Sequence, residues 1–347
     1  MNTVRSGEEV RIGLIGAGRI ARVHAQACRG VSGGRLVAVA DIVESAAEKL
    51  SQEYGLESYR DYRDVLARPD IDAVLIATPN WLHAEMAIAA ARAGKHIFCQ
   101  KPIALTLEDA DAMIATANEA GVVLQVGFML RFTPPMPNVK ELVASGALGD
   151  IISIRAAVFG WEPSAEWFYL KQRGGGVILD TMIHFADLTC WLAGPVVRTY
   201  SEGGAYVLEG AKKHGSPDNA SVTLRHAGGA VSQLYISWTS GYGSFFYEVY
   251  GSKGSISINF LERQISLLYL KEGVNTAALN YPAGWSHPDV IWPFGYGGEA
   301  QYFVDQIRGR ASGGNATGED GRKALEIVLA AQQSLDKGAV VELGGGT

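Results

Sequence analysis

The chain has 347 residues, long enough for two domains, and its formal net charge of −6 at pH 7 argues against nucleic acid as its main partner. The first nine residues lack the apolar core of a signal peptide, and no segment approaches the ~20 apolar residues that a membrane span needs. We therefore expect neither a signal peptide nor a membrane anchor.

A glycine turn near the N-terminus follows the first apolar segment, residues 10–15. Gly16 and Gly18 end that segment, and a helical pattern begins at Arg19 and Ile20. A dinucleotide-binding βαβ unit requires this order of strand, glycine turn and helix. Gly16 permits the tight turn, Gly18 lets the backbone approach a pyrophosphate, and the helix start at Arg19 and Ile20 offers N–H groups to an anion.

An acid ends the second apolar segment, which covers residues 35–40 and stops at Asp41. A carboxylate about 20 residues past the glycines suits the ribose hydroxyls of a dinucleotide. It also repels a 2′-phosphate, and no Arg or Lys follows before Lys49, which favours NAD over NADP. The alternative for Asp41 is a solvated strand end or a helix N-cap.

Apolar segments and helical patterns alternate from Val10 to about Gly127, which predicts a doubly wound parallel sheet with helices on both faces. We assign residues 1–128 to this Rossmann domain. Right-handed crossovers bring the carboxyl ends of all its strands to one edge. The residues expected at this edge, besides the glycine turn and Asp41, are Thr78, Pro79, Asn80, Gln100 and Lys101.

Lys101 comes directly after a predicted buried strand, residues 96–99, and before Pro102, which restricts it to extended backbone angles. We interpret it as a cation fixed beside the nicotinamide, with an ordinary surface lysine as the alternative. For His83, two interpretations stay open. It contacts the cofactor through the loop 78–83, or it lies in the first turn of the following helix.

The alternation breaks after residue 128, and we assign residues 129–347 to a second, α+β domain. Several β-rich segments with glycine-rich turns predict a large, mostly antiparallel open sheet. These segments are residues 151–159, 197–202, 220–225, 231–239, 245–250, 255–259 and 264–269. One broad face of such a sheet suits packing on a second subunit.

Two stretches of this domain carry polar residues in unusual places. Residues 161–169, which include Tyr169, form a polar and aromatic loop that suits a polyhydroxylated substrate, or packing under a loop. A predicted helix over residues 177–193 is apolar except at positions such as Asp180 and His184, which are four apart and share one face. The alternatives are a core histidine paired with Asp180 or Asp187, and a zinc or manganese site.

The three cysteines, Cys28, Cys99 and Cys190, are few, odd in number and widely spaced, and each lies in an apolar segment. We expect buried free thiols, which fits a reducing cytoplasm. No cysteine–histidine spacing indicates structural zinc, and we expect no metal.

Together these motifs resemble the glucose–fructose oxidoreductase, inositol dehydrogenase and rhizopine-catabolism (Gfo/Idh/MocA) dehydrogenases, nearly from end to end. The matching motifs are Gly16-Ala17-Gly18-Arg19-Ile20-Ala21, Thr78-Pro79-Asn80 with His83, Lys101-Pro102, and Gly174-Gly175-Gly176 before Asp180-x-x-x-His184. The set in this order is specific, although no single member is. One departure is Gln100, where the family usually has Glu, although Gln can still hydrogen-bond the cofactor.

The resemblance implies an NAD(P)-dependent enzyme that acts on sugars or cyclic polyols, as a homodimer or homotetramer formed through the C-terminal sheet. It also implies that Lys101, Asp180 and His184 are catalytic. Weaker candidates for substrate contacts are Arg131, Tyr169 and Tyr296.

The expected reaction moves a hydride from a secondary alcohol to NAD. In it, His184 removes the hydroxyl proton, Lys101 stabilises the developing negative charge on the oxygen, and Asp180 orients His184 or the hydroxyl. Two other functions stay open. One is glycoside hydrolysis by transient oxidation with bound NAD, and the other is a cofactor-binding module without catalysis.

Overall fold

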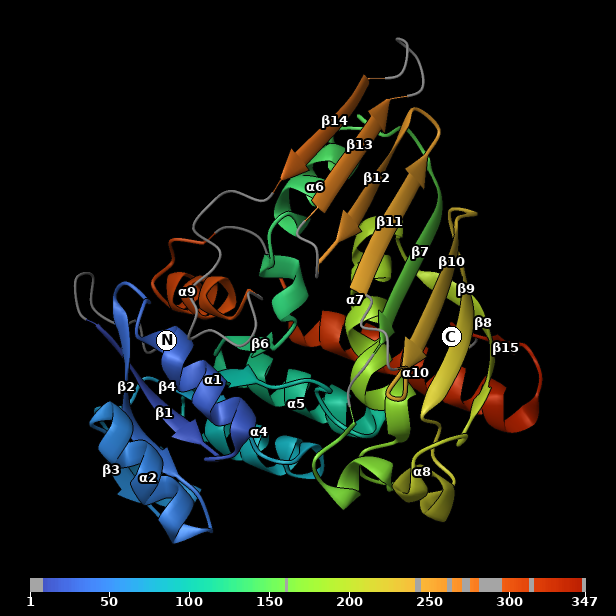
Figure 1. The fold of residues 1–347 in the computed structure, drawn as a ribbon. Coiled ribbons are helices and arrows are strands. Elements are labelled where there is room, and N and C mark those ends of the chain that lie inside the picture. The colour runs from blue at the N-terminus through green and yellow to red at the C-terminus, as the bar shows by residue number, and fades with distance from the viewer. Residues whose placement is uncertain are drawn as a thin grey trace. The chain divides into compact units, whose positions relative to one another are not determined.

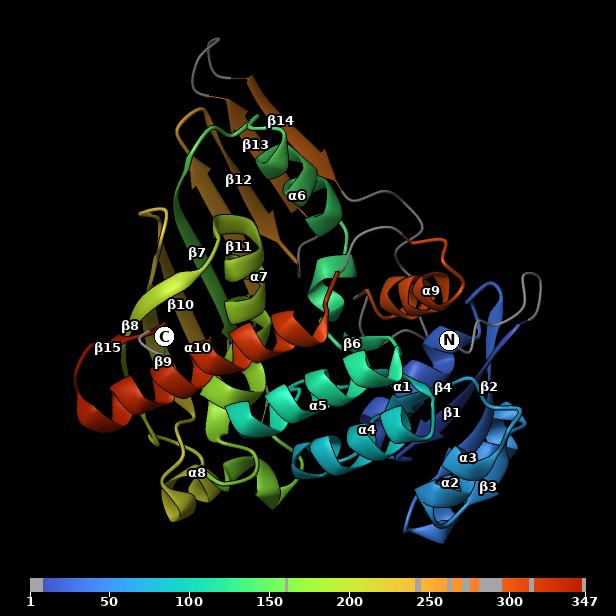
Figure 2. The same cartoon turned by 180° about the vertical axis from the view of Figure 1, so that it is seen from behind.

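The computed structural model describes residues 9–159, 162–240, 245–260, 264–269, 275–280, 295–311 and 315–344 (Figures 1 and 2). The chain divides into two compact units, Met1–Phe132 with Phe294–Arg322, and Thr133–Pro293 with Lys323–Thr347. The chain first passes from one unit to the other after Phe132, four residues after the expected boundary at residue 128. The expected second domain was continuous to residue 347, whereas the described residues 295–311 and 315–322 belong to the N-terminal unit.

The first unit is built on a six-stranded parallel sheet in the order β3-β2-β1-β4-β5-β6. Its strands are β1 (Val10–Ile15), β2 (Gly34–Ala40), β3 (Glu57–Tyr59), β4 (Ala73–Ile76), β5 (His96–Cys99) and β6 (Leu124–Val126). This order confirms the predicted doubly wound sheet. It places the topological switch point, where ligands bind in such folds, at the carboxyl ends of β1 and β4.

Helices cover both faces of this sheet. They are α1 (Arg19–Cys28), α2 (Glu44–Tyr54), α3 (Tyr62–Ala67), η1 (Asn80–Leu82), α4 (His83–Arg92), α5 (Leu107–Ala120), η2 (Met129–Phe132) and α9 (Tyr296–Ile307). Ala25 of α1, Leu50 of α2 and Phe303 of α9 share one apolar core with β1 and β2. On the other face, α3 lies so close to β1 that a Cβ at Gly13 would be 2.4 Å from a methyl group of Val65. Helices α4 and α5 lie side by side (Figure 2).

Among its described residues, the second unit contains a nine-stranded sheet in the order β14-β13-β12-β11-β7-β10-β9-β8-β15. β7 and β10 pair in parallel and every other neighbouring pair is antiparallel, which confirms the predicted mostly antiparallel sheet. The strands are β7 (Ile151–Phe159), β8 (Val196–Gly204), β9 (Asn219–His226), β10 (Val231–Ser237), β11 (Phe245–Gly251), β12 (Gly254–Asn259), β13 (Gln264–Tyr269), β14 (Asn275–Asn280) and β15 (Val341–Glu342).

Helices lie against one face of this sheet, and on the other, called the open face, described residues of β9 and β10 are exposed. The remaining helical elements are α6 (Met136–Ala144), η3 (Glu166–Tyr169), η4 (Ile178–Met182), α7 (Ile183–Ala193), α8 (Glu209–His214) and α10 (Gly318–Lys337), which begins in the first unit. Phe185 of α7 packs against Phe245 and Tyr247 of β11. Along β9 and β10 buried and exposed residues alternate, and the exposed set includes Tyr235 at 43% exposure. In the described part of the chain, no helix has both the length and the hydropathy of a bilayer span.

The helix that carries Asp180 differs from the expectation of one α-helix over residues 177–193. Residues Ile178–Met182 form a π-helical turn, η4, and the α-helix α7 begins only at Ile183. π-Helical turns are rare and occur frequently at functional sites. The i, i+4 spacing of Asp180 and His184 therefore does not describe a regular α-helical face.

Candidate active site

The glycine turn after β1 has the geometry that a dinucleotide requires. Gly16 has φ +102°, and a Cβ there would lie 2.7 Å from the Ala77 carbonyl oxygen, so only glycine fits this close approach to the end of β4. Gly18 is the N-cap of α1, and apart from its neighbours in the chain no described atom lies within 4 Å of where its Cβ would be. The start of α1, at Arg19 and Ile20, therefore borders open space, in which a pyrophosphate can approach the helix N-terminus.

The Asp41 carboxylate is hydrogen-bonded to this turn. One carboxylate oxygen accepts the Ala17 N–H at 2.7 Å, and the other accepts the Val43 N–H at 2.8 Å. These two bonds fix the carboxylate beside the glycine turn and leave lone pairs on both oxygens. The side chain is half-buried, and the following residue, Ile42, is 80% exposed. Asp41 directly follows β2, and the N-cap of α2 is Val43, so the interpretation of Asp41 as a helix N-cap is wrong.

His83 joins the loops that follow β4 and β5. Its side chain is buried, with Nδ1 2.8 Å from the Pro102 carbonyl oxygen and Nε2 3.0 Å from the Thr78 carbonyl oxygen. Burial lowers the pKa of His83, and the neutral imidazole has a single N–H to donate to one of the two carbonyls. His83 is the first residue of α4, as one of its two interpretations states, and its ring holds the Thr78 loop against the Lys101-Pro102 loop.

Gln100 and Lys101 follow β5 directly and differ in burial. Gln100 is buried, and its amide Nε2 lies 2.6 Å from His24 Nε2 on α1. Lys101 is half-buried, and its peptide bond to Pro102 is cis. Thr78 and Pro79 are also half-buried, whereas Asn80 is buried. The first unit thus brings the glycine turn, Asp41, the Thr78 loop and Lys101 to the carboxyl edge of one sheet.

A buried polar cluster behind Gln100 was not expected from the sequence. His24 and Glu299 are both 0% exposed, with His24 Nδ1 4.0 Å from Glu299 Oε1. Neither oxygen of Glu299 has a hydrogen-bond partner among the described residues. Burial raises the pKa of Glu299 well above its ordinary value and lowers the pKa of His24 to about 3. His24 is therefore neutral near pH 7, and burial favours the protonated form of Glu299. The one feature of the sequence that indicates this cluster is the position of His24 on the apolar face of α1, with Ala21 and Cys28.

In the second unit, an otherwise buried helical segment has three partly exposed positions, and all three carry polar side chains. Every residue from 174 to 189 is described, and all of them are buried except Asp180, Thr181 and His184. The helix can begin here because Gly176 has φ +71° and lies where a Cβ would be 2.7 Å from the Pro217 carbonyl oxygen. Asp187, one turn further, is only 2% exposed. A carboxylate, a hydroxyl and an imidazole are thus the side chains of this stretch that are not buried.

A hydrogen-bond chain holds the Asp180 carboxylate. The indole N–H of Trp238 donates to Thr181 Oγ1 at 2.9 Å, and the Thr181 hydroxyl donates to Asp180 Oδ2 at 3.2 Å. Trp238 is 3% exposed and packs edge-on against Tyr169, with ring centroids 5.9 Å apart. Because the indole occupies a Thr181 lone pair, the Thr181 hydroxyl hydrogen is directed at Asp180. Neither Thr181 nor Trp238 was expected from the sequence to take part in the site.

The three candidate substrate contacts lie in different places. Arg131 is 3% exposed, and its guanidinium bonds Asp320 at 2.9 Å and Asn315 at 3.1 Å within the first unit. Tyr296 also belongs to the first unit, where it begins α9 and its ring meets His24 edge-on. Tyr169 belongs to the second unit, in the loop 161–169, of which Trp161 lies outside the described residues.

Among the described residues, no group of three or more His, Cys, Asp or Glu side chains is placed to hold a metal ion. The three cysteines are free thiols, two of them buried, and burial followed by the charge of Glu299 raises the pKa of Cys28 to about 12. The first unit does fit a dinucleotide, because the Gly16 cradle, the open surroundings of Gly18 and the anchored Asp41 carboxylate supply the parts that such a ligand needs.

Comparison with known proteins supports the same assignment. The family model described as "Oxidoreductase family, NAD-binding Rossmann fold" matches residues 10–128, and the GFO/IDH/MocA C-terminal domain matches residues 136–257. The myo-inositol 2-dehydrogenase of Thermotoga maritima is 31% identical over 96% of this chain and 98% of its own length. The scyllo-inositol 2-dehydrogenase (NAD(+)) of Bacillus subtilis is 32% identical over 96% of each chain.

Among solved structures, a levoglucosan dehydrogenase in complex with NADH superimposes with a TM-score of 0.85 at 27% identity, over 97% of this chain and 100% of that one. The family models and the end-to-end relatives agree with the resemblance found in the motifs and with the two sheets. The chain therefore belongs to the GFO/IDH/MocA family of oxidoreductases, and its first unit is the NAD-binding Rossmann domain of that family.

Proposed function

We propose that the protein is an NAD-dependent dehydrogenase that oxidises a secondary alcohol of a sugar or cyclic polyol. The observation that carries this proposal is the buried helix that becomes accessible at Asp180, Thr181 and His184. A partly exposed carboxylate and imidazole on one buried helix suit proton removal from a hydroxyl. The relatives named for inositols and levoglucosan support the substrate class.

We assign the chemical roles as follows. His184 takes the proton of the substrate hydroxyl, because imidazole is the side chain whose ordinary pKa, ~6.5, is closest to neutral. Lys101 binds the same oxygen and stabilises its negative charge as the C–H bond breaks. Asp180, held by Thr181, orients the hydroxyl or the imidazole. When bound, NAD accepts the hydride, so the alcohol loses one hydride and one proton and becomes a ketone.

The residues of the first unit would hold the cofactor. The start of α1, at Arg19 and Ile20, faces the pyrophosphate, and Asp41 accepts hydrogen bonds from the ribose hydroxyls. The Asp41 carboxylate also repels a 2′-phosphate, which favours NAD over NADP. Thr78, Pro79, Asn80, His83 and Gln100 complete the proposed cofactor-binding set, with His83 acting through the two loops that it joins.

A substrate panel tests the proposal. Inositols, aldoses and sugar acids are offered with NAD and with NADP, and the absorbance of the reduced cofactor is followed. We expect a polyol-dependent rise with NAD. Tightly retained cofactor with cleavage of a glycoside and no net NADH would indicate hydrolysis by transient oxidation instead. Uptake of NADH without turnover of any compound would indicate a binding module.

We further propose that the protein works in the cytoplasm as a homodimer or homotetramer formed through the open face of the second sheet. Its three free thiols fit a reducing compartment. The open face exposes Tyr235 on β10 and Tyr200 on β8, which is 37% exposed. Light scattering on the wild type and on Tyr235→Glu measures the assembly, and we expect the charged variant to shift it towards monomer.

A further inference from the structure

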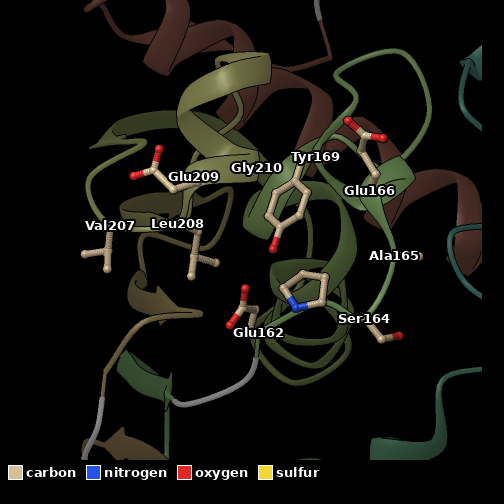
Figure 3. Close-up of a pocket in the computed structure, with 10 residues that line it drawn as sticks. Glu162, Ser164, Ala165, Glu166, Tyr169, Val207, Leu208, Glu209 and Gly210 are labelled. Carbon is tan, nitrogen blue, oxygen red and sulfur yellow. The ribbon is translucent and has the colours of Figure 1, made fainter.

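A cleft with a volume of about 450 Å³ lies in the second unit, between the segment 162–169 and the start of α8 (Figure 3). Of the candidate residues above, it includes Tyr169 alone. Its polar lining is formed by Glu162, Glu166, Glu209 and Tyr169, and its apolar lining includes Pro163 and Leu208. A cleft of this size accommodates one sugar ring.

Both walls of the cleft are fixed without a ligand. On one side, the fully buried carboxylate of Asp218 accepts the backbone N–H groups of Tyr206, Val207 and Leu208 at 2.9, 2.8 and 2.8 Å. On the other side, Glu166 pairs with Lys213 at 2.6 Å and also contacts His214, both on α8. The walls are therefore preorganised, which lowers the cost of binding.

Tyr169 presents an unused hydrogen-bonding group to this cleft. Its side chain is 6% exposed, and its ring is held between Trp238 and the backbone of α8, where a Cβ at Gly210 would be 2.5 Å from the ring. Its hydroxyl points into the cleft (Figure 3) and has no hydrogen-bond partner among the described residues. Burial, then the charges of Glu162 and Asp218, raise the pKa of Tyr169, so the hydroxyl keeps its proton.

The charge of the cleft is not balanced. Glu166 is neutralised by Lys213 and His214, and Glu209 pairs with Lys212 at 2.9 Å. Glu162 also points into the cleft (Figure 3), and it forms no ion pair or hydrogen bond with the described part of the chain. One uncompensated carboxylate therefore faces the unused hydroxyl of Tyr169.

This combination fits a hydroxylated ring. A ring hydroxyl can accept from Tyr169 and donate to Glu162, while the C–H face of the ring packs on Pro163 and Leu208. The Glu162 carboxylate attracts an ammonium group and repels a carboxylate or phosphate. Trp238 packs against Tyr169 and donates to Thr181, and neither Asp180 nor Thr181 lines the cleft. The occupant of the cleft is therefore not the ring that meets Asp180.

We propose that this cleft binds a sugar unit that is not oxidised, and that it selects neutral and amino-bearing rings over rings that carry a carboxylate or a phosphate. The choice of sugars as ligands rests on the proposed function. The charge preference rests on Glu162 and Tyr169 alone.

Ligand-observed NMR titration of the full chain tests the proposal with three probes, D-glucosamine, D-glucose and D-glucuronate, at a pH at which the amine is protonated. We expect the order of affinity glucosamine, glucose, glucuronate. Glu162→Lys is expected to reverse glucosamine and glucuronate, with a change of about tenfold in their ratio. The matched control is Glu202→Lys, an exposed acid on β8 outside the cleft, which should leave the order unchanged.

Leu208→Trp locates the binding site, because an indole at this position fills the cleft. Loss of glucosamine binding in Leu208→Trp supports the cleft, and unchanged binding overturns it. An order of affinity that Glu162→Lys does not alter also overturns it, and the exposed position of Glu162 makes that variant the safer one for folding. If the charge effect holds but no polyol is oxidised, the proposed function fails and the cleft stands. If polyols are oxidised without the charge effect, only the cleft proposal fails.

Discussion

The two sets of candidate residues are held in place in different ways. In the first unit they follow strands of one parallel sheet, and backbone groups fix them, as when Ala17 N–H bonds Asp41 and two carbonyls face His83. In the second unit they lie on one helix, and Asp180 depends on Trp238, which is 57 residues from Thr181 in sequence. A site made of strand ends follows from topology, whereas a site on a helix depends on distant side chains.

The largest expected effects come from removing one proposed catalytic residue in each region. Lys101→Ala and His184→Ala should each lower kcat by roughly 10²–10⁴, because the first loses charge stabilisation and the second loses the general base. Steady-state kinetics on an active polyol and NADH binding by fluorescence measure the two properties separately. We expect NADH binding to survive in both variants.

If both variants turn over normally, the proposed roles are wrong. The double variant sharpens the comparison between the two regions. If both residues act on the same hydroxyl, it should lose much less than the product of the two single effects, because groups that act as a unit are not additive.

The second prediction concerns the buried cluster of the first unit, where side chains rather than backbone groups are in contact. The raised pKa of Glu299 means that the folded protein holds a proton that the unfolded chain releases above about pH 4.5. Stability is therefore lost as the pH rises from 4.5 towards the folded pKa. Glu299→Gln has no such proton, so its stability relative to wild type should grow by up to ~1.4 kcal/mol for each pH unit.

Chemical denaturation of both proteins at several pH values measures this difference. Both proteins contain His24, whose lowered pKa makes the folded state less stable as the pH falls below 6.5. This effect is common to both stability curves. A difference that shrinks as the pH rises would show instead that Glu299 is ionised and paired with His24 across the 4.0 Å gap.

The third prediction tests a backbone-anchored residue. Asp41→Ala removes the acceptor for the ribose hydroxyls, and hydrogen bonds to a charged group contribute about 1.5–3 kcal/mol. We expect kcat/KM with NAD to fall roughly tenfold to 150-fold, and the NADP to NAD ratio to rise. Asp61→Ala is a matched control, since Asp61 also follows a strand but caps α3 by accepting the Arg63 N–H. An unchanged cofactor ratio in Asp41→Ala would remove its role.

More of the fold and candidate site could be predicted from the sequence in the first unit than in the second, for physical reasons. Continuous apolar segments, glycines and a strand-end acid specify a parallel sheet and its binding edge, so the Rossmann fold and the position of Asp41 followed from local patterns. The cluster of His24 with Glu299 joins α1 to a helix 275 residues later in the chain, and no local pattern connects them. Similarly, apolar periodicity predicted a helix over 177–193 but not its π-helical turn, which adds a residue to one turn.

A further prediction addresses the part of the site that the sequence did not reveal. Thr181→Val replaces the hydroxyl that donates to Asp180 with a methyl group of similar size, and it also leaves the buried Trp238 N–H without its acceptor. A net hydrogen bond is worth about 0.5–1.5 kcal/mol, so kcat/KM should fall roughly threefold to tenfold. Thr181→Ser restores the hydroxyl and should restore most of the activity.

Thr189→Val is the matched control for this test. Thr189 lies on α7, is fully buried, and its hydroxyl donates to the Ala186 carbonyl, so the substitution removes a hydroxyl from the same helix without touching Asp180. If both valine variants lose stability but only Thr181→Val loses activity, Thr181 positions Asp180 rather than merely supporting the helix. Equal losses of activity would mean that removing any buried hydroxyl from this helix lowers activity. The difference between residues fixed by backbone groups and residues fixed by side chains would then have no consequence for catalysis.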